Sequence, residues 1–257
     1  MYYNRNLYLY MKHQSQGQQY NGVLPTILET NTFYSWMRCG TAYQNIFVKI
    51  LKTIKLKKNS HALSVSTGNG FWDYISFKHE KYIANITATD IVKCPVNKKD
   101  QYMLQTMGNW KYTQVKADKQ LPFSENKFDL IYHYDVLEHV NKPFLFLSEQ
   151  YRVLKKGGTI IVGTPNLLRI MNILRIIVGK LDFPQYHATW DVVGDYFHTF
   201  EFAEWHLKIL MEEIGFKDIK MHYVFFGIPF KNIQFSAFPK YRIFQLLCHF
   251  LVVEGKK

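Results

Sequence analysis

A glycine-containing turn and the acidic residue twenty positions after it are the first features of the sequence that could do chemistry. The turn covers residues 66–70 (STGNG), between an apolar run and a helical pattern. Glycine has no Cβ, so a ligand can approach the backbone closely there. Asp90 ends a second apolar run and can accept both hydroxyl protons of a ribose. These features predict a site for a nucleoside-containing cofactor, with contacts from Ser66, Gly68, Asn69, Gly70, Asp90 and Ile91.

The residues that open the following helix narrow the kind of cofactor. A dinucleotide fingerprint requires a third glycine there, for close packing of helix against strand. This chain has the bulky Phe71 and Trp72 in that place. The pattern therefore disfavours NAD and leaves S-adenosylmethionine as the other cofactor that such a turn can bind.

Alternating strands and helices must position these residues. Short apolar runs predict strands over residues 61–66, 86–91, 112–116, 128–133 and 159–162, with helical patterns between them. Such alternation is typical of an α/β fold, a Rossmann-like doubly wound sheet that is mainly parallel. The amphipathic helix expected at 201–214 is followed by two more strands, at 217–224 and 249–254.

Residues 128–140 (FDLIYHYDVLEHV) resemble the fourth-strand motif of class I S-adenosylmethionine-dependent methyltransferases. The closest branch is that of the quinone-biosynthesis O-methyltransferases and bacterial sugar or lipid methyltransferases. Residues 121–129 and 151–166 are similar to the family's segments on either side, and 198–216 resemble its last helix before an antiparallel strand pair. The resemblance runs from about residue 30 onward. It implies S-adenosyl-L-methionine as the cofactor, methyl transfer as the reaction and an antiparallel last strand.

The resemblance also implies roles for single residues. Gly68 and Gly70 match the glycines near the methionine part of the cofactor, and Asp90 matches the acid that holds the ribose. Three further positions match cofactor contacts of the family. They are Asp118 near the adenine amino group, Lys119 beside it, and Tyr134 at the end of the fourth strand.

Two positions depart from the family pattern. Ser64 stands where the family has an acid that organises the glycine loop, and Ser66 stands where it has a glycine. These departures support a second hypothesis, a non-catalytic relative that keeps the fold as a binding or scaffold protein. A third hypothesis is an RNA methyltransferase.

Histidines after the fourth strand are candidates for a general base, because their reference pKa of about 6.5 suits proton transfer at neutral pH. His139 is the first candidate, since it follows the fourth strand at the cofactor end; His133, His187 and His198 come next. His139 and Glu138 could equally form a structural pair. No metal site is expected.

The acceptor is narrowed by motifs that the chain lacks. The fourth strand does not end in the Asn/Asp-Pro-Pro-aromatic motif of amino-group DNA methyltransferases, so DNA is not an expected partner. An insert at about 166–200 holds an apolar helical stretch followed by aromatic residues. It forms either a packed lid or an apolar pocket. We expect methylation at oxygen of a small-molecule, sugar or lipid-linked acceptor.

Charge and composition limit the partners and the cellular location that we expect. The net charge is +12, and residues 1–60 hold eight Lys and Arg against one acid. We expect a basic helical cap at 1–60, which is solvated or faces an anionic acceptor or membrane, and a methyltransferase domain at 61–257. Three cysteines without a CxxC pair predict neither a disulfide framework nor a zinc site. With no long apolar stretch and no signal core, a cytoplasmic protein with peripheral membrane contact is expected. The oligomeric state stays open.

Overall fold

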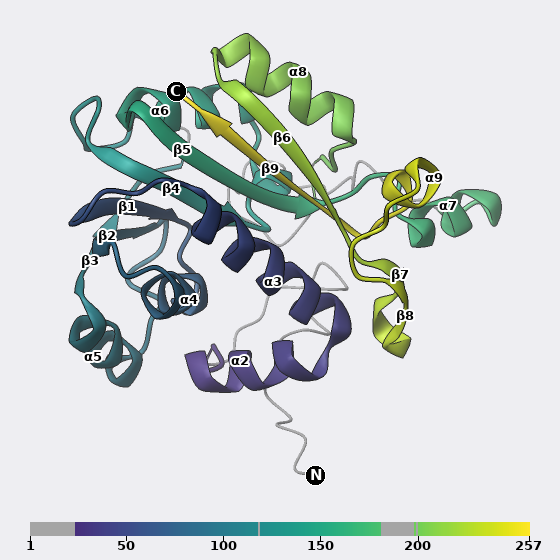
Figure 1. Ribbon diagram of the computed structural model, residues 1–257, viewed down its shortest axis with the longest axis horizontal. Coiled ribbons are helices and arrows are strands. Elements are labelled where there is room, and N and C mark those ends of the chain that lie inside the picture. Colours follow the sequence, from purple (N-terminus) through teal and green to yellow (C-terminus); the bar gives the residue numbers. More distant parts are fainter. Residues whose placement is uncertain (1–23, 118, 181–197, 199) are drawn as a thin grey trace.

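Seven strands form one sheet in the order β3-β2-β1-β4-β5-β9-β6 (Figure 1). The computed structural model describes residues 24–117, 119–180, 198 and 200–257. The strands of this sheet are β1 (Ser60–Val65), β2 (Ile83–Asp90), β3 (Asn109–Gln114), β4 (Phe128–Tyr134), β5 (Leu154–Pro165), β6 (Lys217–Val224) and β9 (Phe250–Lys256). β1 to β5 pair in parallel, and β9 runs antiparallel to both β5 and β6. The predicted fold class and the antiparallel last strand are confirmed.

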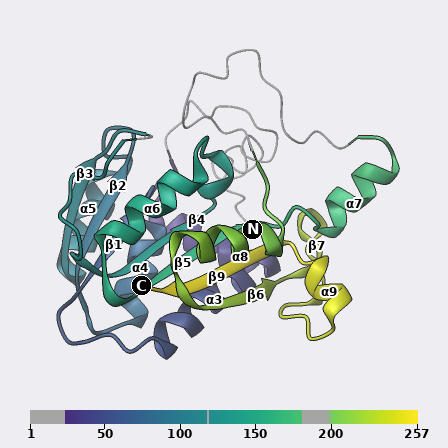
Figure 2. The same ribbon diagram turned by 90° about the horizontal axis from the view of Figure 1, so that it is seen from above.

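Helices cover both faces of the sheet. The described helices are α2 (Ile27–Trp36), α3 (Arg38–Thr53), α4 (Phe71–His79), α5 (Lys98–Met107), α6 (Pro143–Val153), α7 (Ile170–Ile177), α8 (Glu204–Ile214) and α9 (Arg242–Leu246). Side chains of α2 to α5 share one core with one face of the sheet, while α6 and α8 share a second core with the other (Figure 2). None of the described helices is long and apolar enough to cross a membrane.

The described part of residues 1–60 packs directly on the sheet. Tyr43 and Phe47 of α3 lie in the same buried cluster as Tyr132 of β4 and Ile86 of β2. The lysines of α3, Lys49 and Lys52, are exposed on its other side. This is the amphipathic basic helix that the sequence predicts, and the division at residue 60 stays a prediction.

Several elements differ from the sequence-based expectation. The fifth strand begins at Leu154 rather than at 159, because Leu154 already pairs with Phe128 of β4 ahead of the glycine turn. Helix α5 has a polar sequence that buries only Asp100 and Leu104, so it lacks a clear apolar period. The connection after β6 holds the hairpin of β7 (Phe226–Ile228) and β8 (Ile233–Ser236), followed by α9.

The strand order reverses between the neighbouring strands β1 and β4: β2 and β3 follow β1 on one side, and β5 follows β4 on the other. In an open α/β sheet, ligands bind beyond the carboxyl ends of the strands at this point. The glycine turn follows β1 directly, and a short 3-10 helix, η1 (Leu137–His139), follows β4. The fold therefore brings the predicted cofactor loop and the predicted base to the same edge of the sheet.

Candidate active site

The glycine turn and Asp90 meet at the carboxyl ends of β1 and β2. The Gly68 N–H donates to Asp90 Oδ2 at 3.3 Å, and the Ile91 N–H donates to Asp90 Oδ1 at 2.8 Å. Burial raises the pKa of the Asp90 carboxyl, and the backbone N–H groups of Gly68, Val92 and Ile91 oppose that rise. The loop and the acid, twenty-two residues apart, are thus joined as one unit.

Backbone conformation explains the glycines of this turn. Gly68 and Gly70 have φ of +54° and +83°, in the left-handed region that glycine adopts without a steric penalty. A Cβ on Gly68 would meet no atom within 4 Å, so open space lies beside its backbone. A Cβ on Gly70 would lie 3.0 Å from Leu104 Cδ1. The turn leaves room for a ligand at Gly68 and packs tightly at Gly70.

Ser66, which stands where the family has a glycine, also has a left-handed conformation, with φ of +53°. A residue with a Cβ costs about 1–2 kcal/mol in this region. We expect Ser66→Gly to raise the free energy of unfolding by about 0.5–1 kcal/mol. Glycine removes this strain, and its larger loss of chain entropy on folding offsets part of the gain. Urea denaturation followed by circular dichroism measures the change, and a lower midpoint would contradict the strain argument.

Asp73 supplies a carboxylate beneath the glycine turn. It lies in the first turn of α4 and is fully buried. Its Oδ2 accepts from Thr67 Oγ1 at 2.9 Å and from Trp110 Nε1 at 2.7 Å, and its Oδ1 accepts from the Tyr132 hydroxyl at 2.9 Å. Burial raises its pKa, and hydrogen bonds, first among them that of Ser64, oppose the rise. Asp73 therefore supplies a buried carboxylate next to Ser64, where the sequence lacks the acid of the family pattern.

The remaining predicted cofactor residues differ in their surroundings. The Asn69 side chain donates to the Pro25 carbonyl at 2.9 Å and to Thr30 Oγ1 at 2.6 Å, which ties the turn to α2. Lys119 is exposed just beyond β3, and Asp118 lies outside the described residues. The Tyr134 side chain is buried and stacks on Trp72, with ring centroids 4.1 Å apart, so only its backbone faces the strand end.

A second cluster follows β4. Glu138, His139 and His198 have side-chain ligand atoms that all lie within 4.8 Å of one another. The rings of His139 and His198 have centroids 5.0 Å apart. Thr164 Oγ1 of β5 donates to Glu138 Oε2 at 2.9 Å. Two of the four histidines that the sequence singled out therefore meet at one place, with two imidazoles and a buried carboxylate that could hold a divalent metal ion.

The other two candidate histidines are not in this cluster. His133 is 2% exposed and packs against Phe146, and burial lowers its pKa to about 3. A histidine in such a place stays neutral and cannot exchange protons with a substrate. His187 lies outside the described residues.

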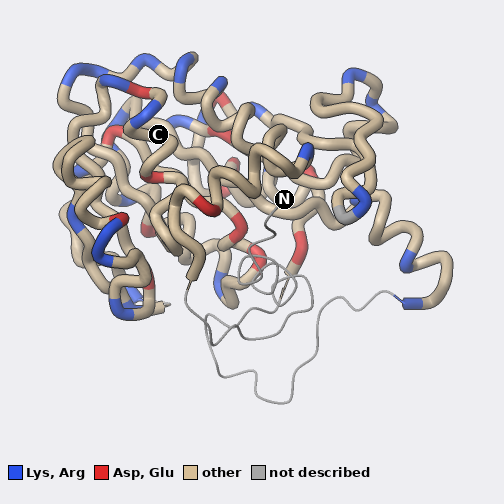
Figure 3. Tube along the Cα trace, turned by 90° about the horizontal axis from the view of Figure 1, so that it is seen from below, with Lys and Arg blue, Asp and Glu red and all other residues tan. Residues whose placement is uncertain are grey.

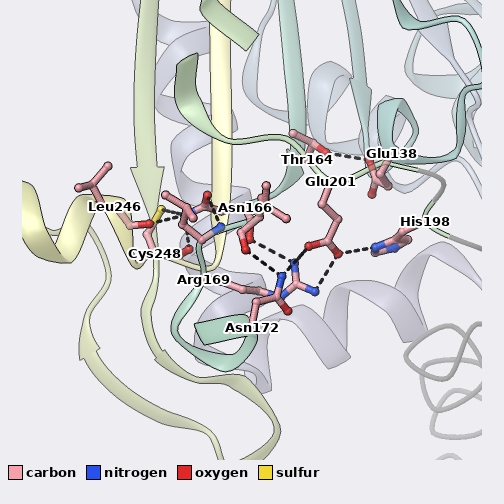
Figure 4. A network of polar contacts seen from close by, with 11 residues as sticks. Glu138, Thr164, Asn166, Arg169, Asn172, His198, Glu201, Leu246 and Cys248 are labelled. Atoms are coloured by element: carbon pink, nitrogen blue, oxygen red, sulfur yellow. Dashed lines mark hydrogen bonds and ion pairs between the residues drawn. The ribbon is translucent and has the colours of Figure 1, made fainter. Parts of the chain in front are cut away.

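Glu201 lies between His198 of this cluster and the side chains of Arg169 and Asn172 (Figure 4). It is buried and forms an ion pair with Arg169, whose Nη2 donates to Oε1 at 2.8 Å. Asn172 Nδ2 donates to its Oε2 at 2.9 Å, and His198 Nδ1 lies 2.6 Å from its Oε1. Burial acts to raise the pKa of Glu201, but His198 and Arg169 lower it to about 2. Burial acts to lower the pKa of His198, but the carboxylates of Glu201 and Glu138 raise it by more, so this pKa lies above its usual value.

The buried carboxyl of Glu138 and the part-buried carboxyl of Asp135 lie beside the histidines. Burial and their mutual repulsion raise the pKa of Asp135 to about 8, while burial raises that of Glu138 to about 6. Asp135 accepts from the Tyr43 hydroxyl at 3.2 Å and has a left-handed φ of +54°. The strand end thus concentrates titratable carboxyl groups, and a cationic cofactor or a metal ion would favour their ionised form.

Part of the chain is similar in sequence to known proteins. Residues 63–162 match the model of a family described as "Methyltransferase domain". Over these residues the chain is similar to a methyltransferase domain, in agreement with the resemblance that the sequence indicates. The matched residues include the glycine turn, Asp73, Asp90 and His139.

Two curated relatives match the domain region. One, 30% identical over 98 residues, is named "Probable S-adenosylmethionine-dependent methyltransferase" of Mycolicibacterium smegmatis. The other, 29% identical over 112 residues, is the ubiquinone/menaquinone biosynthesis C-methyltransferase UbiE of Pseudoalteromonas translucida. The matches cover 38% and 42% of this chain and only 32% and 43% of the relatives.

Solved structures extend the likeness over most of the chain. A methyltransferase of Thermotoga maritima superposes with a TM-score of 0.54 and 19% identity, covering 82% of this chain and 87% of that one. One of Archaeoglobus fulgidus gives 0.51 and 16%, covering 83% and 94%. At these identities the likeness shows the fold, so the methyltransferase fold includes elements outside the matched domain region.

Proposed function

We propose that the chain transfers a methyl group from S-adenosylmethionine to a hydroxyl of a small-molecule, sugar or lipid-linked acceptor. The observation that carries the proposal is the joining of Gly68 and Asp90 at the point where strand order reverses. The residues fit the cofactor, because open space lies beside Gly68 and the Asp90 carboxylate is held by backbone N–H groups. The buried carboxylate of Asp73, which accepts from Thr67 of the loop, supports this proposal over a non-catalytic relative.

The chain's own residues would align the reactants and accept a proton. When bound, the cofactor supplies a methyl group on a cationic sulfonium. An acceptor oxygen that takes this methyl group loses its proton, and His139 lies at the strand end that faces the site. His198 is less suited to accept it, because the Glu201 carboxylate favours its protonated form. Alignment and exclusion of water supply most of the acceleration, and a general base adds about 10²–10⁴-fold.

His139→Gln should therefore lower kcat by about 10²-fold or more and leave the affinity for S-adenosylmethionine within about twofold, because the base contributes to the chemical step alone. Release of S-adenosylhomocysteine in the presence of candidate hydroxyl acceptors measures kcat, and calorimetry measures affinity. The matched control is His79→Gln, on α4 away from the strand ends. Unchanged turnover in His139→Gln would remove His139 as the base.

The same cluster supports a second role for His139. Its imidazole, that of His198 and the Glu138 carboxylate have the donor types of a divalent-cation site, and a cation would also relieve the repulsion between the carboxyls of Glu138 and Asp135. The two roles predict different results. A general base works in EDTA, whereas a metal ligand gives activity that EDTA removes and that Mn²⁺ restores in the wild type but not in His198→Ala.

A function on nucleic-acid bases has less support. The strand end after β4 contains Asp135, Glu138 and two histidines rather than a basic surface. An RNA methyltransferase would bind RNA with a steep dependence on salt. Absent or salt-independent RNA retention by the purified protein would exclude that hypothesis.

A further inference from the structure

Helix α7, the β7–β8 hairpin and helix α9 lie together at one end of the molecule (Figures 1 and 2). Each of them exposes large apolar side chains. We call this end the apolar lobe. Six of its side chains, between 38% and 73% exposed, are Ile177, Val178, Phe235, Tyr241, Ile243 and Phe244. Scattered exposed apolar residues are ordinary on protein surfaces, but a contiguous group of this kind marks an interaction site.

Direct contacts hold the three elements together. The Ile170 N–H at the start of α7 donates to the Leu247 carbonyl at the end of α9, at 3.2 Å. Phe226 of the hairpin stacks on Phe244 of α9, with ring centroids 4.8 Å apart, and lies 5.4 Å from Phe235. Aromatic rings and Lys240 line an open hollow of about 440 Å³ between hairpin and α9. The apolar lobe is therefore a defined surface with aromatic walls.

The charge around the apolar lobe has one sign. Residues 166–180 and 225–249 contain six Lys and Arg and no Asp or Glu. Arg169 and Arg242 pair with Glu201 and Glu204. The other four have no ion-pair partner among the residues that the structure describes; they are Arg175, Lys180, Lys231 and Lys240, all exposed. Figure 3 shows Lys and Arg distributed over this end of the chain.

We propose that the apolar lobe binds the surface of an anionic lipid bilayer. Aromatic and aliphatic side chains at the tip would enter the headgroup region, where Tyr and Phe are stabilised, while the four basic residues face lipid phosphates. The occupant is a bilayer because apolar groups and uncompensated positive charge alternate along the same elements, as in interfacial helices. The proposal does not depend on methyl transfer.

Vesicle sedimentation with the full chain tests the proposal. We expect binding to phosphatidylcholine vesicles that contain phosphatidylglycerol to exceed binding to pure phosphatidylcholine by about tenfold or more, and to fall as salt is raised. Tyr241→Glu/Ile243→Glu should lower binding to the anionic vesicles by about tenfold, because it places two acids in the apolar lobe.

A matched control makes the same changes elsewhere. Tyr102 of α5 and Ile209 of α8 are 72% and 57% exposed, compared with 73% and 57% for Tyr241 and Ile243. Tyr102→Glu/Ile209→Glu therefore adds the same charge at equal exposure and should keep vesicle binding. Lys231→Ala/Lys240→Ala, at exposed positions that do not endanger folding, should weaken binding to anionic vesicles several-fold.

Three results would overturn the proposal. The first is no vesicle binding by the wild type, or equal binding to neutral and anionic vesicles. The second is an equal loss of vesicle binding in the control variant and in the variants of the apolar lobe. The third is a loss of vesicle binding that occurs only when Lys55, Lys57 and Lys58 are changed to alanine. This result would assign the binding to the N-terminal basic region. Sedimentation velocity tests the remaining alternative, that a second copy of the chain covers the apolar lobe. In that case the wild type is a dimer that does not bind vesicles, and Tyr241→Glu/Ile243→Glu dissociates it.

Discussion

Replacing Asp90 with alanine should lower the affinity for S-adenosylmethionine by about 10²-fold or more. Two charge-assisted hydrogen bonds to a ribose contribute about 1.5–3 kcal/mol each, and loss of the carboxylate removes both. Asp90 also accepts from the Gly68 N–H, so its loss leaves the glycine turn less well positioned. Titration calorimetry with S-adenosylmethionine and S-adenosylhomocysteine measures the change. Both ligands should be affected alike, because they share the ribose.

Two companion variants make the Asp90 result interpretable. Asp90→Asn keeps the shape and one acceptor oxygen, and it should lose less affinity than Asp90→Ala. Asp129→Ala removes an aspartate of the same sheet that pairs with Lys155 near the start of β4. It should leave affinity unchanged, because the amino end of β4 is remote from the strand-end crevice. Unchanged affinity in Asp90→Ala, with a native circular dichroism spectrum, would refute the ribose assignment.

Asp73→Ser should lower the free energy of unfolding by about 3–5 kcal/mol. Three donors, Trp110 Nε1, the Tyr132 hydroxyl and Thr67 Oγ1, would lose their buried acceptor, and each unsatisfied group costs about 1–3 kcal/mol. Relief of carboxylate desolvation offsets part of this sum. Because Thr67 belongs to the glycine turn, affinity for S-adenosylmethionine should fall as well. Urea denaturation and calorimetry measure the two effects.

Moving the carboxylate back to the strand tests what Asp73 does. Ser64→Asp alone should destabilise the protein, since two buried carboxylates would face each other. Combined with Asp73→Ser, the same change should recover at least half of the stability and affinity that Asp73→Ser loses. A double variant that is simply the sum of the two single variants would show that Asp73 packs beneath the turn without replacing the acid.

The sequence predicts the sheet because its strands alternate with helices and its central strands, such as β4, are largely apolar and buried. β4 and β6 begin at the predicted residues, and strand order follows from the topology of such folds. Gly68 and Asp90 were predicted as neighbours because the carboxyl ends of parallel strands meet at one edge. Local pattern and general topology were sufficient for these features.

Other features depend on contacts between distant segments. Asp73 gave no signal beyond an acid among aromatic residues, and its role appears only when Trp110 and Tyr132 from other strands reach it. The meeting of His139 with His198 depends on a connection that the sequence does not fix. Helix α9 and the β7–β8 hairpin were missed because their apolar side chains remain partly exposed and so follow no burial period.

The position of β9 has a consequence for the order of folding. β9 lies between β5 and β6 and hydrogen-bonds to both, so β6 has no partner in the sheet until residues 250–256 arrive. During synthesis, β1 to β5 can assemble as they emerge, whereas β6 and its helix α8 must wait for a strand made later. The open edge of β5 is a transient site for wrong strand pairing. A chaperone that shields this edge would raise the yield of folded protein more than one that acts on the amino-terminal half.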